Sequence, residues 1–435
     1  MKQIVVLLSM VFAFQVYGQN ASEWDWIAPQ NTNNDSIFSS QDSLQTFDAI
    51  LFTWEELYRS ADTLYRQNRY DDALAMAQKA LQTAQQTYGE EHLNVAESCI
   101  QLGEFLLVQG QYTEALPYLQ HALRLHKQFL GEVHAKTANS YYLIGAAYRH
   151  QGLYAEAEQH YERALATWEA FDDSQHGDVA KVLNELGLLH TDIGNYTTAE
   201  SYLLRALQIW NAEGNEENFN VAAVVNNLAL VYMALERYAD AEPLFLQSLH
   251  LREKLYGSVH PRIAPVLVNL AELYTVSGNY IEASLLYQRV LLIYADTYGE
   301  LHPNLATIQN NLGQLYRDMG HDQDAEETYF QALSLYEQTV GHQHPGTAIT
   351  HENLASLYHD HHRYTQAAFH YTEALNIRKV IFGEQHRSVK IIQEQLVQLE
   401  FEQRQEREIF LKDFWMGEVI WGMIKSIVWI LFTAW

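Results

Sequence analysis

The feature that most constrains this chain is a segment of 42 residues, 260–301, which recurs along most of the sequence. Tyr280 lies near its middle and has tyrosine counterparts at steps of 42 residues, with Asp322 as the one exception. An alanine follows three residues after each of these eight positions: Ala73, Ala115, Ala157, Ala199, Ala241, Ala283, Ala325 and Ala367. A fixed period of this size predicts an array of small units, each of which completes its core against its neighbours.

Each unit is predicted to contain two helices, because its apolar residues recur at helical spacing. Leu267, Leu270 and Tyr274 mark the first helix, which we call helix A; Tyr287 marks the second, helix B. Gly278 lies between them, and most units repeat this glycine, which can adopt the positive φ that ends a helix. A second glycine ends helix B, and in three units a proline opens the next helix A, as expected from the preferences of helix ends.

The residues at the signature spacing are Leu270, Ala271, Tyr274, Ala283, Tyr287 and Val290. With YGExHP between units and NNLGQLY in a helix A, they resemble the kinesin light chain type of tetratricopeptide repeat. The resemblance covers residues 49–383. It implies an all-α, right-handed superhelical solenoid of about eight repeats that binds proteins in a concave groove lined by helix A.

The N-terminal residues are typical of an exported protein. Residues 1–18 contain Lys2, an apolar core at 4–14 and a small-residue cleavage site, which together predict a secretory signal peptide. Residues 19–48 are rich in Asn, Gln, Ser and Asp, and we expect a polar linker there. The sequence therefore predicts a location in the periplasm or cell envelope.

The C-terminal residues follow a different pattern. Residues 384–413 begin like a ninth helix A and become highly charged, which predicts a capping helix at the open end of the array. Residues 414–435 are apolar and rich in tryptophan, but they carry Glu418 and Lys425. Three interpretations remain: a membrane span, an interfacial helix, or an apolar strip packed on the array.

The charge of the chain restricts its partners. The 27 Lys and Arg residues face 54 Asp and Glu residues, which gives a net charge of −27. A protein this acidic repels nucleic acid, because the nucleic-acid backbone is itself anionic. We therefore expect a protein or peptide partner, with a basic one favoured.

No catalytic motif or cofactor fingerprint is present in the sequence. The histidines that recur once per unit are too far apart to share one metal ion, because neighbouring units are offset by ~10 Å. The run His359-Asp360-His361-His362 has a better spacing for metal, although we expect a solvated turn. The one cysteine, Cys99, is expected in the core. We predict no catalytic residue, no metal site and no cofactor.

The candidate partner-binding residues are asparagines on helix A. An amide side chain offers donors and an acceptor, which suits the backbone of an extended peptide. The alternative is that some of these amides satisfy neighbouring helices within the array. Arg317, on the same predicted helix as two of the asparagines, completes the set: Asn184, Asn226, Asn227, Asn269, Asn310, Asn311, Asn353 and Arg317.

The function that fits these features is a non-enzymatic scaffold that binds a peptide or protein partner and is exported and associated with a membrane. One alternative is the regulatory arm of a truncated, caspase-like protease, since bacterial chains of this type are often followed by such a domain. A metal-buffering protein is another, and it depends on the run 359–362 alone.

Overall fold

The computed structural model describes residues 53–171, 177–212, 218–384 and 386–433. The regular structure in this part of the chain is entirely helical. The predicted signal peptide, 1–18, and the predicted linker, 19–48, lie outside the described residues.

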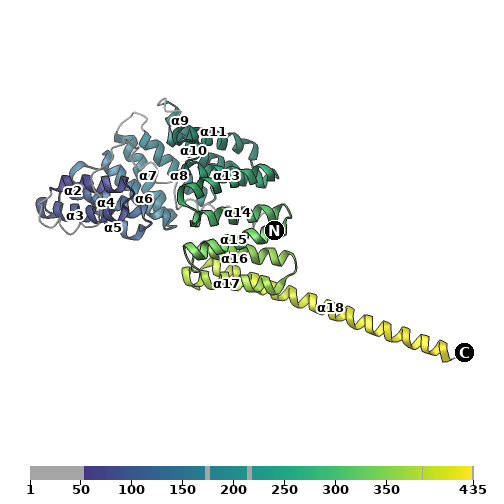
Figure 1. Cartoon of the computed structure of the whole chain (residues 1–435). Helices are drawn as coiled ribbons and strands as arrows, with labels where there is room; N and C mark the ends of the chain where they lie inside the picture. Colours follow the sequence, from purple (N-terminus) through teal and green to yellow (C-terminus); the bar gives the residue numbers. More distant parts are fainter. Residues whose placement is uncertain (1–52, 172–176, 213–217, 385, 434–435) are drawn as a thin grey trace. The chain divides into compact units, whose positions relative to one another are not determined.

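Eight consecutive helix pairs follow the predicted repeats (Figure 1). The A helices of repeats 1 to 8 are α2 (Trp54–Arg66), α4 (Leu93–Val108), α6 (Ala135–His150), α8 (Gly177–Asp192), α10 (Phe219–Ala234), α12 (Ala264–Val276), α14 (Pro303–Asp318) and α16 (Pro345–Asp360). The B helices are α3 (Tyr70–Tyr88), α5 (Tyr112–Leu130), α7 (Tyr154–Phe171), α9 (Tyr196–Ala212), α11 (Tyr238–Tyr256), α13 (Tyr280–Tyr298), α15 (Asp322–Thr339) and α17 (Tyr364–Phe382). A short 3₁₀ turn, η2 (Pro261–Ile263), precedes α12, and α18 (Arg387–Thr433) ends the described chain. The predicted all-α repeat solenoid is confirmed.

Helices A and B meet at small residues. All eight alanines of the repeat signature have no exposed surface. Gly313 on α14 shows how close the approach is, because a Cβ there would lie 2.8 Å from the ring of Tyr329 on α15. Close packing at these positions explains why the sequence keeps small side chains at the same place in every unit.

In all eight repeats, one residue of the turn between helices A and B has a positive φ, even where that residue is not glycine. Gly278 has a φ of 79°. Asn68, Glu236 and His362 stand at the equivalent position in repeats 1, 5 and 8, with φ values of 61°, 59° and 55°. The repeat geometry is therefore kept where the sequence departs from the glycine pattern.

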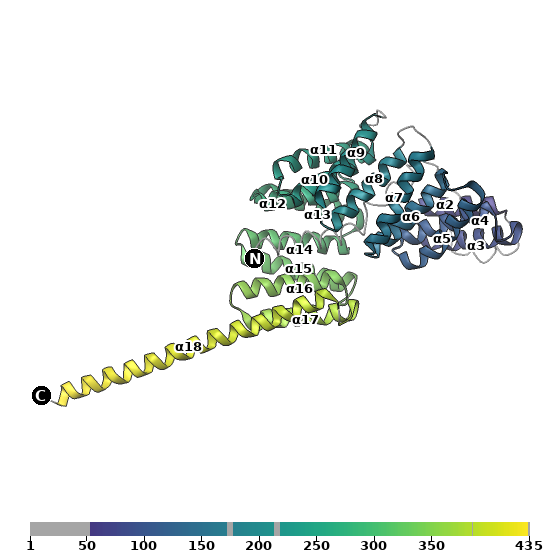
Figure 2. The ribbon, with the colours of Figure 1, turned by 180° about the vertical axis from the view of Figure 1, so that it is seen from behind.

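The chain divides into two compact units, Met1–Asn269 and Leu270–Trp435, and the division falls within α12. Within the second unit α14, α15, α16 and α17 stack in chain order, and each contacts the next in both views (Figures 1 and 2). The stack continues onto the first part of α18, which contacts α17.

Helix α18 has 47 residues and is about 70 Å long at 1.5 Å per residue. Its first part packs on the last repeat through Val389, Ile392 and Leu399, all of them buried. Its second part runs on past α16 and α17 (Figure 2). The predicted capping helix and the described part of the apolar segment thus form one helix without a break at 413. None of the described helices combines the length and the apolar content needed to cross a membrane.

Candidate partner-binding surface

On A helices such as α4 and α10, the partly exposed residues fall along one narrow line. On α4, every residue from Val95 to Leu107 is buried apart from Glu97 and Glu104. On α10, Ala223 and Asn227 lie on a similar line of partly exposed residues. Residues three, four or seven apart share one face of a helix. We call these partly exposed positions of the A helices the A stripe.

Four amides of the first unit join the A helices of neighbouring repeats. Asn227 donates from Nδ2 to Oδ1 of Asn184, 2.9 Å away, and its own Oδ1 accepts from Nδ2 of Asn226 at 3.3 Å. Asn269 donates from Nδ2 to Oδ1 of Asn226 at 3.0 Å. The four residues form a continuous row of hydrogen bonds over α8, α10 and α12.

The second unit has one such pair. Asn353 on α16 donates from Nδ2 to Oδ1 of Asn310 on α14, 3.0 Å away. Asn311 differs, because its Nδ2 is buried and has no hydrogen-bond partner in the described structure. Asn311 is therefore the one predicted site asparagine whose Nδ2 is a buried, unpaired donor.

The amides retain capacity for further hydrogen bonds. Oδ1 of Asn269 and Oδ1 of Asn353 accept no hydrogen bond within the described residues. An amide nitrogen has two hydrogens, and each of these asparagines uses only one of them in the row. The hydrogen bonds within the array thus fix the orientation of these side chains and leave some of their donors and acceptors unused.

Charged residues that stand 43 positions apart also pair between neighbouring A helices. Arg149 donates from Nε to Asp192 at 2.9 Å, and both side chains are largely buried. Arg317, which the sequence placed among the partner-binding residues, donates from Nη2 to Asp360 at 2.5 Å and to Ser356 at 2.9 Å. Only 15% of the Arg317 side chain is exposed. The structure therefore places Arg317 between neighbouring A helices, with its guanidinium bound within the array.

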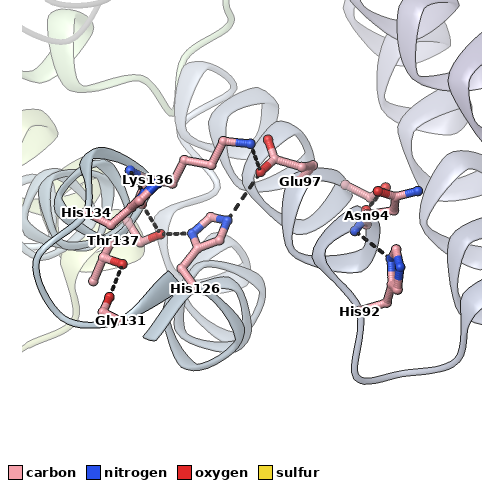
Figure 3. Close-up of polar contacts among 10 residues, drawn as sticks. His92, Asn94, Glu97, His126, Gly131, His134, Lys136 and Thr137 are labelled. Atoms are coloured by element: carbon pink, nitrogen blue, oxygen red, sulfur yellow. Dashed lines mark hydrogen bonds and ion pairs between the residues drawn. The ribbon is translucent and has the colours of Figure 1, made fainter. Parts of the chain in front are cut away.

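The recurring histidines cap the A helices, a role that the sequence analysis missed. Nδ1 of His92 accepts a hydrogen bond from the backbone N–H of Asn94 at 3.0 Å (Figure 3). His302 does the same at 3.2 Å, and its ring stacks on Tyr298 with the centroids 4.5 Å apart. Burial lowers the pKa of His302. The same cap is made by His134, His260, His344 and His386, and by the side chain of Asn218 in repeat 5.

The position of these residues was a signal that the sequence analysis did not use. A histidine or asparagine stands at the N-cap position, immediately before the first residue, of α4, α6, α10, α14, α16 and α18. In repeat 6, His260 stands immediately before η2, which leads into α12. The remaining recurring histidine, His176, lies outside the described residues.

The run 359–362 is engaged in contacts with neighbouring helices. Nε2 of His359 lies 2.7 Å from Glu402, and Nδ1 of His362 lies 2.7 Å from Glu406, both on α18. His361 pairs with Asp322 at 2.9 Å. Across the described residues, no group of three or more His, Cys, Asp or Glu side chains is arranged to hold a metal ion.

One buried cluster has the residue types of a hydrolytic triad. Nδ1 of His126 lies 2.8 Å from Oγ of Ser140, and its Nε2 lies 3.4 Å from Glu97, which also pairs with Lys136 at 2.6 Å (Figure 3). Ser140 has no exposed surface, and its hydroxyl donates to the backbone carbonyl of Lys136. A substrate cannot reach this hydroxyl, so the cluster is structural.

Cys99 is buried as expected, and burial raises the pKa of its thiol to about 12.

The model of the tetratricopeptide repeat family matches residues 55–104, 98–170, 178–254, 220–291, 262–338 and 325–379. The chain belongs to the tetratricopeptide repeat family. The predicted family is therefore confirmed. Proteins of this family generally act as scaffolds rather than as enzymes.

Several solved structures resemble this tetratricopeptide protein. The apo quorum sensor NprR from B. thuringiensis is 15% identical, with a TM-score of 0.59 over 77% of this chain and 91% of its own. The apo form of RapI is 12% identical, with a TM-score of 0.50 over 66% and 98%. BtubC (BKLC) from P. vanneervenii is 26% identical, with a TM-score of 0.45 over 52% and 90%. A comparison with curated proteins gave no match. None of these likenesses supports the alternative of a protease arm.

Proposed function

We propose that this protein is a non-enzymatic scaffold that binds a peptide or protein partner along the A stripe. The observation that carries the proposal is the row of asparagines that hold one another across neighbouring A helices. Such a row fixes the amide groups before a partner arrives, which reduces the entropy lost on binding.

The spacing of the row suits an extended backbone. Neighbouring A helices lie ~10 Å apart, as is usual for packed helices, and an extended chain advances ~3.3 Å per residue. One amide is therefore available to about every third residue of a partner. Because an amide both donates and accepts, it pairs with the peptide N–H and C=O whatever the side chains are.

The partner is proposed to be basic. The net charge of −27 supports this, because opposite charge increases the rate of encounter and like charge opposes it. On the A stripe itself, Glu97 and Glu104 are partly exposed acidic residues.

The place of action is proposed from the sequence. Residues 1–18 support export to the periplasm or cell envelope. Residues 414–435 support contact with a membrane surface, because Trp421 and Met423 are 60% and 61% exposed on α18. Exposed apolar side chains on a helix that also carries charges fit an interfacial position.

Site-specific photo-crosslinking tests the proposed surface. A photoreactive phenylalanine at Ala223, on the A stripe of α10, should crosslink to the partner in envelope extract. The same residue at Asn376, an exposed position on helix B of repeat 8, should not. A partner that crosslinks from Asn376 and not from Ala223 would place the binding surface on the B helices and overturn the proposal.

A further inference from the structure

Glu104 on α4 is an acidic group without a partner. It makes no hydrogen bond and no ion pair within the described residues, although it is largely shielded from water. The nearby acids differ in this respect, because Glu97 pairs with Lys136 and Asp62 pairs with Arg66. Among the described residues, no cation neutralises this carboxyl group on the A stripe of repeats 1 and 2.

The surroundings of Glu104 disfavour its own negative charge. Burial, and then the charges of Glu97 and Asp62, raise the pKa of Glu104 to about 7. Burial, and then the charges of Glu104, Glu97 and Asp62, raise the pKa of Tyr58 on α2. A positive group placed here would remove this unfavourable energy, because it would neutralise a desolvated carboxylate.

A second unpaired acceptor lies one helical turn away on the same face of α4. Gln101 donates from Nε2 to the backbone carbonyl of Tyr58 at 2.9 Å, which fixes its amide against α2. Its Oε1 is buried and has no partner, and the residue is only 4% exposed. Buried acceptors are normally satisfied, so this one indicates a missing donor.

We propose that Glu104 and Gln101 form a recognition site for an arginine side chain of the partner. This inference rests on the proposed function. A guanidinium carries five N–H donors in a planar fork, which suffice for the carboxylate of Glu104 and, once the side chains that cover it move aside, for the buried Oε1 of Gln101. The first two repeats thus select a basic residue, and the asparagines of later repeats hold the backbone.

The test is the affinity of a fluorescein-labelled dodecapeptide of alternating alanine and arginine, measured by anisotropy with the full chain. Extended, the peptide is about 40 Å long, which spans the three steps of ~10 Å from repeat 2 to repeat 5. Glu104→Gln should weaken binding at least about tenfold, because a buried charge pair loses its anion. The matched control is Glu114→Gln, which removes the same charge from an exposed position on α5 and should change the affinity less than about twofold.

Two further measurements make the outcome decisive. Glu104→Gln should melt no lower than the wild type at pH 8, because it removes a desolvated carboxylate. Wild-type affinity should rise between pH 6 and pH 8 as the Glu104 carboxyl ionises, and this rise should be smaller in Glu104→Gln. Equal affinities of folded Glu104→Gln and Glu114→Gln would overturn the site.

Asn227→Ala, measured in parallel, separates this inference from the proposed function. If Asn227→Ala weakens binding and Glu104→Gln does not, the A stripe binds the peptide without the arginine site. If neither variant weakens it, both proposals are wrong.

Discussion

Asn353 donates its side-chain amide to Oδ1 of Asn310 at 3.0 Å, and the two residues stand 43 positions apart, one more than the repeat period. Asn227 and Asn184 have the same offset, as do Asn269 and Asn226. The extra residue means that each amide contacts the position just before its own equivalent in the preceding repeat. The asparagine contacts between A helices therefore have the same register in both units.

The close approach of helices A and B gives a first prediction. Ala283 on α13 has no exposed surface, so Ala283→Leu should lower the free energy of unfolding by ~1–3 kcal/mol through overpacking. Thermal and urea unfolding measure the change. Ser284→Leu adds the same side chain at the next, partly exposed position and should cost much less. Equal effects would mean that the two helices do not meet at the small residue.

The histidine caps give a second prediction, which concerns pH. A neutral Nδ1 accepts the backbone hydrogen bond, and a protonated one cannot. Burial depresses the pKa of His260, His302 and His344 in the folded state. Their contribution to stability is thus complete above the unfolded pKa of about 6.5 and is lost as the pH falls through the folded pKa. The melting temperature should fall between pH 7.5 and pH 5.

His302→Asn identifies the cause of this acid sensitivity. Asn218 makes the same cap in repeat 5, so asparagine at 302 should keep the cap at both pH values and reduce the loss of stability in acid. His361→Asn is the control, because His361 is exposed and pairs with Asp322 instead of capping a helix. If both variants lose as much stability as the wild type, the caps are not the titrating groups.

The repeat and its small residues could be predicted from the sequence, because close packing in every unit imposes the same alanine eight times. The asparagines could be placed on helix A, but the 43-residue offset could not be read from the period, since it depends on how neighbouring helices pack. Arg317 was predicted to face a partner, and its partners Ser356 and Asp360 are known only from the fold. The change in composition predicted a boundary at residue 413, whereas the structure has one continuous helix, α18, across this position.

The C-terminal segment gives a third prediction. Deleting residues 414–435 should move the protein from the membrane fraction to the soluble fraction, because the exposed apolar side chains on this part of α18 are proposed to contact lipid. Carbonate extraction of the full chain should release an interfacial helix. A full-length protein that is soluble without detergent would contradict the proposed membrane contact.

The most direct test of the central claim is the affinity of the crosslinked partner for a double variant, Asn227→Ala with Asn269→Ala, measured by calorimetry beside the melting temperature. Each lost hydrogen bond is worth ~0.5–1.5 kcal/mol, so loss of two or more should weaken binding about tenfold. Asn376→Ala, exposed on α17, should leave the affinity unchanged. A double variant that melts lower but binds with wild-type affinity per folded molecule would show that the amides only hold the array together, and would contradict the account.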